Sequence, residues 1–366
     1  MSVDALLSRL EAASDSLVEP AVLQPLDPFV ELAGEEFRKR LFATEGADGA
    51  ALCLRPDFTI PVCLSHLNSH LQRPPGEPVI YRYKGTIFRK HRTVGSPEFE
   101  QAGTEWIGHQ DETTTDAAIF ALAMDCAGAV GLSPVVRIGD AHIFDALVAG
   151  LQLPAAWHGR LTAAFGDPAR LEAAVARLSA KDKSNGLASR LAPALAQVDA
   201  ESARAIVDAV VGLSSQQVTS RSADEIAEHI LEQAADNGPD PAAAAVIKRF
   251  GSIQAPVNRA VDALGTFANE VGVDLSDALE NFARRADAMT THGIDTAAMG
   301  FEAAFGRRLS YYTGFVFEMG DPAKPGAEVI AGGRYDKLIA LLKDGVSIPA
   351  VGFSVWLDRL PGQGTP

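Results

Sequence analysis

Two strand-like segments of similar length, separated by a short polar turn, constrain the fold of this chain more than any other feature. They read PVIYRYKGTIFR (78–89) and EFEQAGTEWIG (98–108). The residues between them, KHRTVGSP (90–97), are typical of a turn. Strands joined by so short a connection pair with each other, because a parallel arrangement would need a longer crossover. The pattern therefore predicts a long antiparallel hairpin.

The second strand of this hairpin brings an amide and a carboxylate to one face. Period-two alternation places Phe99, Gln101, Gly103, Glu105 and Ile107 together. Extended geometry separates the backbones of Gln101 and Glu105 by roughly 13 Å, and we expect Gly103 to leave the space between them clear. A small polar molecule could lie there with a group held at each end. A strand with a solvated polar face would produce the same pattern.

Outside the hairpin, the chain divides by composition into a core and an insertion. The first fifteen residues are patterned as an amphipathic helix, and the apolar stretch 17–26 predicts extended chain. Residues 141–288 are rich in alanine and nearly free of strand signals, which predicts a helical insertion. Strand patterns return after it, so residues 1–140 and 289–366 are expected to form one core.

The composition is that of a globular protein, with 47% hydrophobic residues in a chain of 366. We expect a cytoplasmic protein with no membrane contact, because neither an apolar run of about eighteen residues nor a signal-peptide pattern occurs. The formal net charge of −15 argues against a surface that binds a polyanion such as tRNA. Cys53, Cys63 and Cys126 lack CxxC spacing and are expected to be reduced core residues.

Two patterns that could indicate a metal or phosphate site have simpler explanations. His66 and His70 lie four residues apart on an expected helix, but no third ligand accompanies them. The glycines of AGGRYDKL (331–338) precede a helix without the Lys-Ser/Thr pair of a P-loop, so a strand-to-helix turn is expected. No nucleophile signature is present. We therefore predict no metal, no cofactor and no catalytic residue.

Six short segments between residues 54 and 360 form an ordered series of motifs. Together they resemble the core of the class II aminoacyl-tRNA synthetases in its histidyl form. The resemblance implies an α+β fold with an antiparallel sheet core, into which the helical insertion is placed. The segments are LRPDFT (54–59), YRYKGTIFR (81–89), EFEQAGTEWIG (98–108), RRLSYYTGFVFE (307–318), GGRYDKL (332–338) and PAVGFSVWLDRL (349–360).

The resemblance also implies a binding site for the amino acid histidine. Asp57 and Gln101 would accept hydrogen bonds from the ligand ammonium, and Glu105 would accept one from an imidazole N–H. Arg307 would face the ligand carboxylate, since its planar fork matches a carboxylate. The full set of implied histidine-binding residues is Asp57, Thr59, Arg89, Gln101, Glu105, Arg307, Tyr311 and Tyr312.

The chain departs from the synthetase pattern on the side that binds ATP. The turn reads GSPEF (95–99) where histidyl enzymes carry arginines, which removes a phosphate ligand. Trp356 stands where the third class II motif has a glycine, and its indole is expected to fill the adenosine pocket. Ser310 and Arg308 replace an aspartate and a glycine of the RGLDYYTG motif. Arg359 is retained, and a structural ion pair with a carboxylate is its expected role.

A chain that keeps the histidine side and loses the ATP side is similar to the regulatory subunits of ATP phosphoribosyltransferase, the first enzyme of histidine biosynthesis. That family lacks the anticodon-binding domain, and only six residues follow Leu360 here. The resemblance implies a non-catalytic subunit that supports a short-form catalytic subunit and conveys feedback inhibition by histidine as effector. It also implies a homodimer, with the segment around Pro20 at its interface, inside a larger hetero-oligomer.

Two other interpretations remain open from the sequence. A histidyl-adenylate-forming ligase or a truncated histidyl-tRNA synthetase would keep the same histidine residues but would need a working nucleotide site. A regulatory or adaptor module for some other partner would need only the amino acid pocket. Exchange of pyrophosphate into ATP and co-purification with a catalytic subunit distinguish these interpretations.

Overall fold

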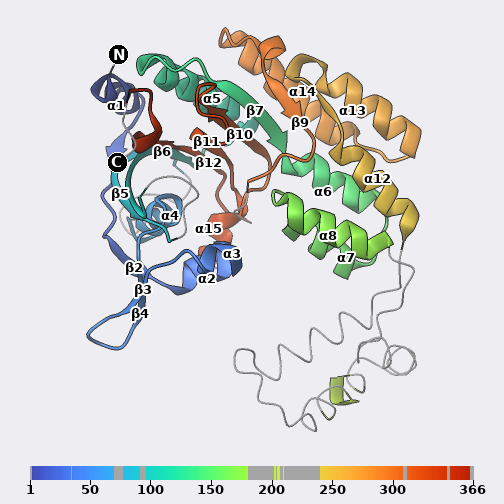
Figure 1. Cartoon of the computed structure of the whole chain (residues 1–366), viewed down its shortest axis with the longest axis horizontal. Coiled ribbons are helices and arrows are strands. Elements are labelled where there is room, and N and C mark those ends of the chain that lie inside the picture. Colours follow the sequence, from blue (N-terminus) through green and yellow to red (C-terminus); the bar gives the residue numbers. More distant parts are fainter. Residues whose placement is uncertain are drawn as a thin grey trace. The chain divides into compact units, whose positions relative to one another are not determined.

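The structure is a computed structural model in which two compact units are distinguished (Figure 1). One unit comprises Met1–Phe144 with Ser252–Pro366, and the other is Asp145–Gly251. The second unit is smaller than the insertion expected from composition, because residues 252–288 fold with the first unit. The described residues are 2–33, 35–69, 77–90, 96–179, 202, 204–206, 209, 240–307, 311–343 and 347–362.

Nine strands within the described ranges form the main sheet of the first unit. Neighbouring strands run antiparallel, except that β1 is parallel to β5 and β7 is parallel to β9. The expected antiparallel core is therefore confirmed, with parallel pairs towards the two ends of the sheet. The strand order is β1 (Ser16–Leu17), β5 (Val79–Phe88), β6 (Glu98–Ile107), β12 (Ala350–Trp356), β11 (Glu328–Arg334), β10 (Phe315–Gly320), β7 (Val135–Asp140), β9 (Gly300–Glu302) and β8 (Gln254–Pro256).

A smaller sheet and a set of helices complete the first unit. In the part of the chain that is described, β2 (Leu23–Pro25), β4 (Ala51–Leu54) and β3 (Ala43–Glu45) pair in that order. The helices are α1 (Val3–Ala12), α2 (Asp27–Ala33), α3 (Glu35–Arg38), α4 (Thr59–Ser69), α5 (Glu112–Ala129), α13 (Val257–Val271), α14 (Ser276–Thr291) and α15 (Lys337–Leu342), with 3-10 turns η1 (Thr296–Ala298) and η2 (Leu357–Arg359).

The predicted hairpin is confirmed as the pair β5 and β6, in continuous antiparallel register from Val79↔Ile107 to Phe88↔Glu98. Strand β12 pairs with the other edge of β6, so that Gly352 lies opposite Glu105 and Trp356 opposite Gln101. Opposed residues share a face, because side chains alternate along each strand. The register therefore brings segments about 250 positions apart in sequence onto one surface.

Helices cover the two faces of this sheet differently. On one face, Phe120 of α5 makes edge-to-face contacts with Phe315 and Phe317 of β10. On the other face, Phe58 stacks on Tyr83 of β5 with 4.4 Å between ring centroids. Residues of α4 and α15 join that second layer in one hydrophobic cluster with β5 and β6. The face beneath α4 and α15 carries Gln101 and Glu105, so it is the face of the predicted site.

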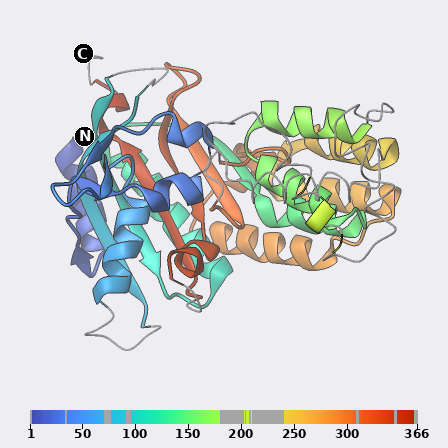
Figure 2. The ribbon, with the colours of Figure 1, turned by 90° about the horizontal axis from the view of Figure 1, so that it is seen from below.

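The second unit is helical wherever it is described. Helix α8 (Pro168–Ser179) packs against α7 (Ala155–Ala164) and α12 (Pro241–Gly251), drawn in green to yellow in Figure 2. The side chains that these helices bury are mainly apolar. Trp157, at 2% exposure, is among the largest fully buried side chains of the protein. Helix α6 (Ala141–Gly150) spans the boundary between the units. Most of the insertion between residues 180 and 239 lies outside the described residues.

The described ranges contain neither a membrane-spanning helix nor a cluster of metal ligands. No helix there is both long enough and apolar enough to cross a bilayer. No group of three or more His, Cys, Asp and Glu side chains within those ranges could hold a metal ion. Of the two histidines considered above, His70 lies outside the described residues, and the His66 ring Nδ1 lies 3.0 Å from the Tyr81 hydroxyl.

Candidate functional site

The loop that connects β4 to α4 carries the first of the predicted site residues. Arg55 donates to the carbonyl oxygens of Pro20 and of Thr86, the latter at 2.8 Å, which ties the RPDFT segment to the hairpin. Asp57 is 4% exposed, and its Oδ1 accepts from the Ile60 amide at 3.4 Å at the start of α4. Thr59 begins the helix and is also buried. The loop therefore turns two polar side chains inward, towards the sheet.

Gln101 and Glu105 lie fully buried on β6, but the space above Gly103 is not clear, and that expectation is wrong. Tyr83 lies opposite Gly103 in the register, and its ring crosses the strand above the glycine. A Cβ at Gly103 would collide with the Tyr83 hydroxyl and the Phe353 carbonyl. The hydroxyl reaches Ser354 Oγ on β12 at 2.8 Å. The glycine therefore makes room for a tyrosine of the chain itself.

Glu105 is held by hydroxyl groups from three separate elements. Its Oε1 accepts from Thr59 Oγ1 at 2.8 Å and from the Tyr83 hydroxyl at 3.5 Å, while its Oε2 accepts from the Tyr335 hydroxyl. Burial raises the pKa of the carboxyl to about 8, and the hydrogen bonds from Tyr335 and Thr59 oppose that rise. A Cβ at Gly352 would overlap the carboxylate. Glu105 is thus a buried carboxyl with a defined position.

Asp57 and Gln101 have polar atoms with no partner. Asp57 Oδ2 and both amide atoms of Gln101 are buried and unbonded among the described residues. Burial raises the pKa of Asp57 to about 6, against the opposing effect of the Arg89 guanidinium. Arg89 itself donates from Nε to the Pro56 carbonyl at 2.6 Å. Buried polar atoms without a partner are uncommon, so these atoms mark a candidate binding site.

The segment that follows the second unit contributes an arginine and two tyrosines. Tyr311 and Tyr312 lie with ring centroids 4.9 Å apart, and Tyr335 packs against them at 5.9 and 6.3 Å. The Arg307 guanidinium lies 5.9 Å from the Tyr312 ring, and its Nε has no partner in the described structure. Burial raises the pKa of Tyr311, and the charges of Asp57 and Glu105 add to this effect. These side chains therefore belong to the same site as the two carboxylates.

Trp356, which the sequence predicts to occlude a nucleotide pocket, lies at the end of β12. It is 2% exposed, with the guanidinium carbon of Arg359 5.2 Å and that of Arg307 6.0 Å from its ring centroid. Arg359 Nη1 lies 3.4 Å from a Glu328 carboxylate oxygen, so the expected structural ion pair is confirmed. The other departures from the synthetase pattern, at Gly95, Arg308 and Ser310, lie outside the described residues.

The structure brings all the predicted histidine-site residues together and adds others that sequence reasoning missed. Tyr83 and Tyr335 hold Glu105, and Gly352 makes space for it. Tyr335 lies in GGRYDKL, one of the segments that carry the family resemblance, but neither the resemblance nor the turn expected there gave it a role in the site. In chemical terms the site offers carboxylate and amide acceptors, an unpaired guanidinium nitrogen and a wall of aromatic rings. That combination suits an amino acid whose side chain carries a further N–H donor.

A pocket elsewhere in the first unit has no residue in common with this site. It measures about 420 Å³ and is formed by α5, β7 and the end of α14, with Met124, Val136 and His292 among its lining residues. Its lining mixes apolar and polar side chains and contains no residue of the predicted site.

Comparison with known proteins places the chain in a family. The family model described as histidyl-tRNA synthetase matches residues 3–230 and 203–360. A relative from Chelativorans sp. is 40% identical over 349 residues, covering 94% of this chain and 92% of its own length, and is named ATP phosphoribosyltransferase regulatory subunit. A relative from Mesorhizobium japonicum with the same name is 41% identical over 368 residues, covering 98% and 96%.

Solved structures show the same fold at lower identity. One, described as an ATP phosphoribosyltransferase regulatory subunit/histidyl-tRNA synthetase from Bacillus halodurans, matches with a TM-score of 0.63 and 20% identity, over 97% of this chain and 76% of its own. A histidine–tRNA ligase subunit from Alicyclobacillus acidocaldarius matches with a TM-score of 0.60 and 23% identity, over 97% and 89%. The chain has the class II fold of histidyl-tRNA synthetase, and it belongs to the family of ATP phosphoribosyltransferase regulatory subunits.

Proposed function

We propose that this chain is the regulatory subunit of an ATP phosphoribosyltransferase in histidine biosynthesis and that it binds free histidine. The histidine-binding residues are Asp57, Thr59, Arg89, Gln101, Glu105, Arg307, Tyr311 and Tyr312. The chain itself carries no catalytic group for the transferase reaction. It supports the activity of a short-form catalytic subunit and conveys feedback inhibition when histidine occupies the site.

One observation carries the histidine proposal: the polar atoms left unpaired in the buried site match the polar groups of an α-amino acid. Asp57 Oδ2 and the Gln101 amide oxygen can accept from an ammonium, and Arg307 Nε can donate to a carboxylate. Glu105, already held by hydroxyl donors, can accept from an imidazole N–H. The unpaired atoms of Asp57, Gln101 and Arg307 would gain partners from such a ligand.

The nucleotide side supports a regulatory role in place of catalysis. The Trp356 indole is buried beside Arg359, and the Arg359 guanidinium is engaged by Glu328. A nucleotide would have to displace the indole and compete with the Glu328 carboxylate for the arginine. We propose that ATP does not bind at this position, and hence that histidine is bound as an effector and is not activated.

Titration calorimetry with histidine tests the pocket. Wild-type protein is expected to bind, and Glu105→Ala is expected to lose about 10- to 150-fold in affinity, because a hydrogen bond to a charged group is removed. The matched control is Glu98→Ala, which removes an exposed glutamate from the same strand and should bind as the wild type does. Equal binding by wild type and Glu105→Ala would exclude this pocket.

The partner is tested by co-purification with a short-form ATP phosphoribosyltransferase catalytic subunit. Activity of that subunit is expected to need this chain, and histidine is expected to inhibit the mixture. Inhibition should disappear with Glu105→Ala while the two chains still co-purify. A catalytic subunit that neither co-purifies with this chain nor responds to it would leave only a histidine-binding module for another partner.

A homodimer within the larger hetero-oligomer is proposed from the segment around Pro20. Leu17, Val22 and Leu23 are large apolar side chains with 44 to 49% of their surface exposed, close together in sequence. Exposed apolar groups that cluster in this way mark interaction surfaces. Substitution of Leu17 and Leu23 by Asp should shift the sedimentation coefficient from that of a dimer to that of a monomer.

The ligase alternative makes an opposite prediction about ATP. A histidyl-adenylate-forming enzyme or a truncated synthetase would catalyse histidine-dependent exchange of pyrophosphate into ATP. We expect no exchange, because the Trp356 side chain fills the position beside Arg359. Measurable exchange by the wild-type protein would overturn the regulatory proposal in favour of the ligase.

A further inference from the structure

Among the described residues, no cation forms an ion pair with the buried carboxyl group of Glu105. Its side chain is 1% exposed, and its hydrogen-bond partners in the described part of the chain are the hydroxyls of Thr59, Tyr83 and Tyr335. Hydroxyls donate hydrogen bonds but do not neutralise charge. An unneutralised carboxylate in such surroundings is strongly disfavoured, so the ligand-free site favours the protonated acid.

The other titratable groups around Glu105 do not supply a positive charge. They are acids, and each carries either no charge or a negative one: Asp57 from the loop before α4, Cys63 from α4, Tyr83 from β5, Tyr335 from the end of β11, and Tyr311 and Tyr312. Strand β12 contributes Gly352 and Ser354 at this point, and neither titrates. Tyr81 lies opposite Glu105 on β5, and its hydroxyl lies 3.0 Å from the His66 ring Nδ1. None of the described groups named here forms an ion pair with Glu105, so a cationic ligand would supply the missing charge.

Nearby arginines are engaged with other acids. The positive charge of Arg89 lowers the pKa of Asp57, which means that it favours the ionised form of that carboxyl. Arg307 Nη1 lies 3.9 Å from a Glu318 carboxylate oxygen. Glu105 also has little freedom to move towards them, because Thr59 and Tyr335 hold its two oxygens and the backbone of Gly352 lies against the carboxylate. The negative charge, when it forms, therefore forms at a defined position.

We propose that the bound ligand and Glu105 share one proton, so that histidine binds with its ring as an imidazolium against the Glu105 carboxylate. When histidine binds, the proton held by the Glu105 carboxylic acid passes to the neutral ring nitrogen, which leaves a carboxylate and a cationic ring. If Glu105 is already ionised, the proton comes from solvent. This inference rests on the proposed binding of histidine and specifies which ligands fit. The site selects α-amino acids whose ring is basic enough to hold the proton.

A count of protons exchanged on binding tests this inference with the whole wild-type chain. Calorimetry is run in phosphate and in Tris, whose ionisation enthalpies differ, at two pH values. A free histidine ring titrates near pH ~6.5, and burial raises the pKa of Glu105 to about 8. At about pH 6 both groups are protonated before binding, so a net release of protons is expected, to which Asp57 adds because burial raises its pKa to about 6. At about pH 8.5 neither is mainly protonated, so an uptake approaching one proton is expected.

Two controls separate this proton from others. Asp57 is already ionised at about pH 8.5, so it does not change the number of protons taken up on binding there. The ligand ammonium adds the same proton uptake in the wild type and in Glu105→Gln. Glutamine cannot hold the proton, and the uptake at about pH 8.5 should fall to the small ammonium contribution. The analogue 1,2,4-triazole-3-alanine has the same shape and a much less basic ring, and should bind at least tenfold more weakly than histidine.

The outcomes distinguish the two levels of the proposal. If histidine fails to bind at any pH, the proposed function fails. If it binds without proton uptake at about pH 8.5, or if the triazole analogue binds as tightly as histidine, the shared proton is wrong while the pocket stands. The wild-type proton count decides this even if Glu105→Gln does not fold.

Discussion

The main sheet carries buried charge on both faces, and the two faces differ in how that charge is satisfied. Beneath α5 and α14, Arg285 donates to Asp116 and to Asp140 at 2.8 Å each. Arg334 donates to Asp116 at 2.9 Å and to Asp336 at 2.9 Å. The residues of this cluster that are at most 3% exposed are Arg285, Asp116, Asp140 and Arg334. Each of them has an opposite charge beside it. This cluster needs nothing from outside the chain.

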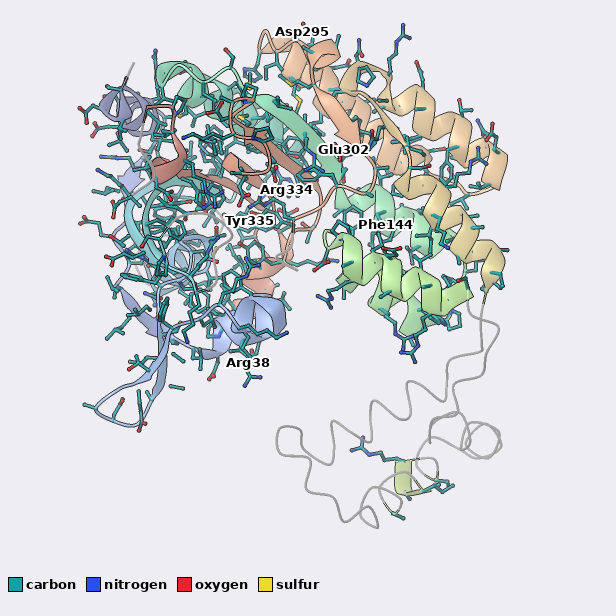
Figure 3. The ribbon with its side chains drawn as sticks, viewed as in Figure 1. Arg38, Phe144, Asp295, Glu302, Arg334 and Tyr335 are labelled. Carbon is teal, nitrogen blue, oxygen red and sulfur yellow. The ribbon has the colours of Figure 1, made fainter. Side chains whose placement is uncertain are left out.

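The opposite face holds Asp57, Gln101 and Glu105, which are just as buried but leave polar atoms unpaired or a carboxyl without a cation. Arg334 and Tyr335 are consecutive residues at the end of β11, one serving each cluster (Figure 3). Burying polar groups without partners costs free energy, whereas a fully paired cluster avoids most of that cost. We interpret the paired cluster as stabilising the fold and the opposite face as the ligand site proposed above.

Breaking the paired cluster should have the largest effect. Asp116→Ala leaves two buried arginines with fewer counter-charges, and the free energy of unfolding should fall by about 3–5 kcal/mol. Urea denaturation measures this. The control Arg9→Ala removes an exposed ion pair to Asp125 at 3.3 Å and should cost no more than about 1 kcal/mol. A loss below that level for Asp116→Ala would mean that the cluster is not the stabilising one.

Moving the Glu105 carboxylate should weaken the binding of histidine at the face that carries Asp57, Gln101 and Glu105. Gly352→Ala places a methyl group where the carboxylate lies, so histidine affinity should fall about 100-fold or more, as expected when a binding group moves by about 1 Å. Gly265→Ala is the matched control, because its Cβ meets nothing closer than 4.0 Å and it lies within helix α13. Calorimetry with both variants gives the comparison. Undiminished binding by Gly352→Ala would show that the position of Glu105 is unimportant.

The unpaired carboxyl should make ligand-free stability depend on pH. The pKa of Glu105 is about 8 in the folded chain, against about 4.3 when unfolded, so the folded state alone holds the proton between these values. Stability should therefore fall as pH rises from about 4 to about 8. Glu105→Gln removes this contribution and should exceed wild type at pH 8 by about 2 kcal/mol, at about 1.4 kcal/mol per pKa unit with allowance for relaxation.

Urea denaturation across that pH range checks the pH dependence, with Glu98→Gln as the control of the same chemistry at an exposed site. Asp57 contributes the same sign in every variant, because burial also raises its pKa. Parallel pH profiles for wild type and Glu105→Gln would show that Glu105 is ionised in the folded chain and has found another counter-charge.

The smallest effect is expected at Tyr335, which directly follows Arg334 of the paired cluster and donates to Glu105 on the other face. Tyr335→Phe removes one hydroxyl donor from Glu105, so histidine affinity should fall about tenfold. Because that hydrogen bond lowers the pKa of Glu105, its loss should also move the pH profile of ligand-free stability to higher pH. A structural role alone would leave this profile unchanged, and that result would separate Tyr335 from the site.

Much of the site could be predicted from the chain. The alternation of apolar and polar residues predicted the β5–β6 hairpin, and the resemblance carried by the ordered motifs implied a set of residues that the structure brings together. Tyr83, Tyr335 and Gly352 could not be predicted as parts of the site. Their roles arise from pairing between β6 and strands or turns far away in sequence, and local patterns contain no information about such pairing.

Composition also predicted a helical insertion but extended it to residue 288, whereas residues 252–288 fold with the first unit. Helical propensity is a local property, and it does not indicate the surface against which a helix packs. By itself the sequence determined which segments are strands or helices and which chemical groups are available. Tertiary structure alone decided which of those groups are buried and which find partners, because burial and pairing depend on neighbours that only the folded chain brings close.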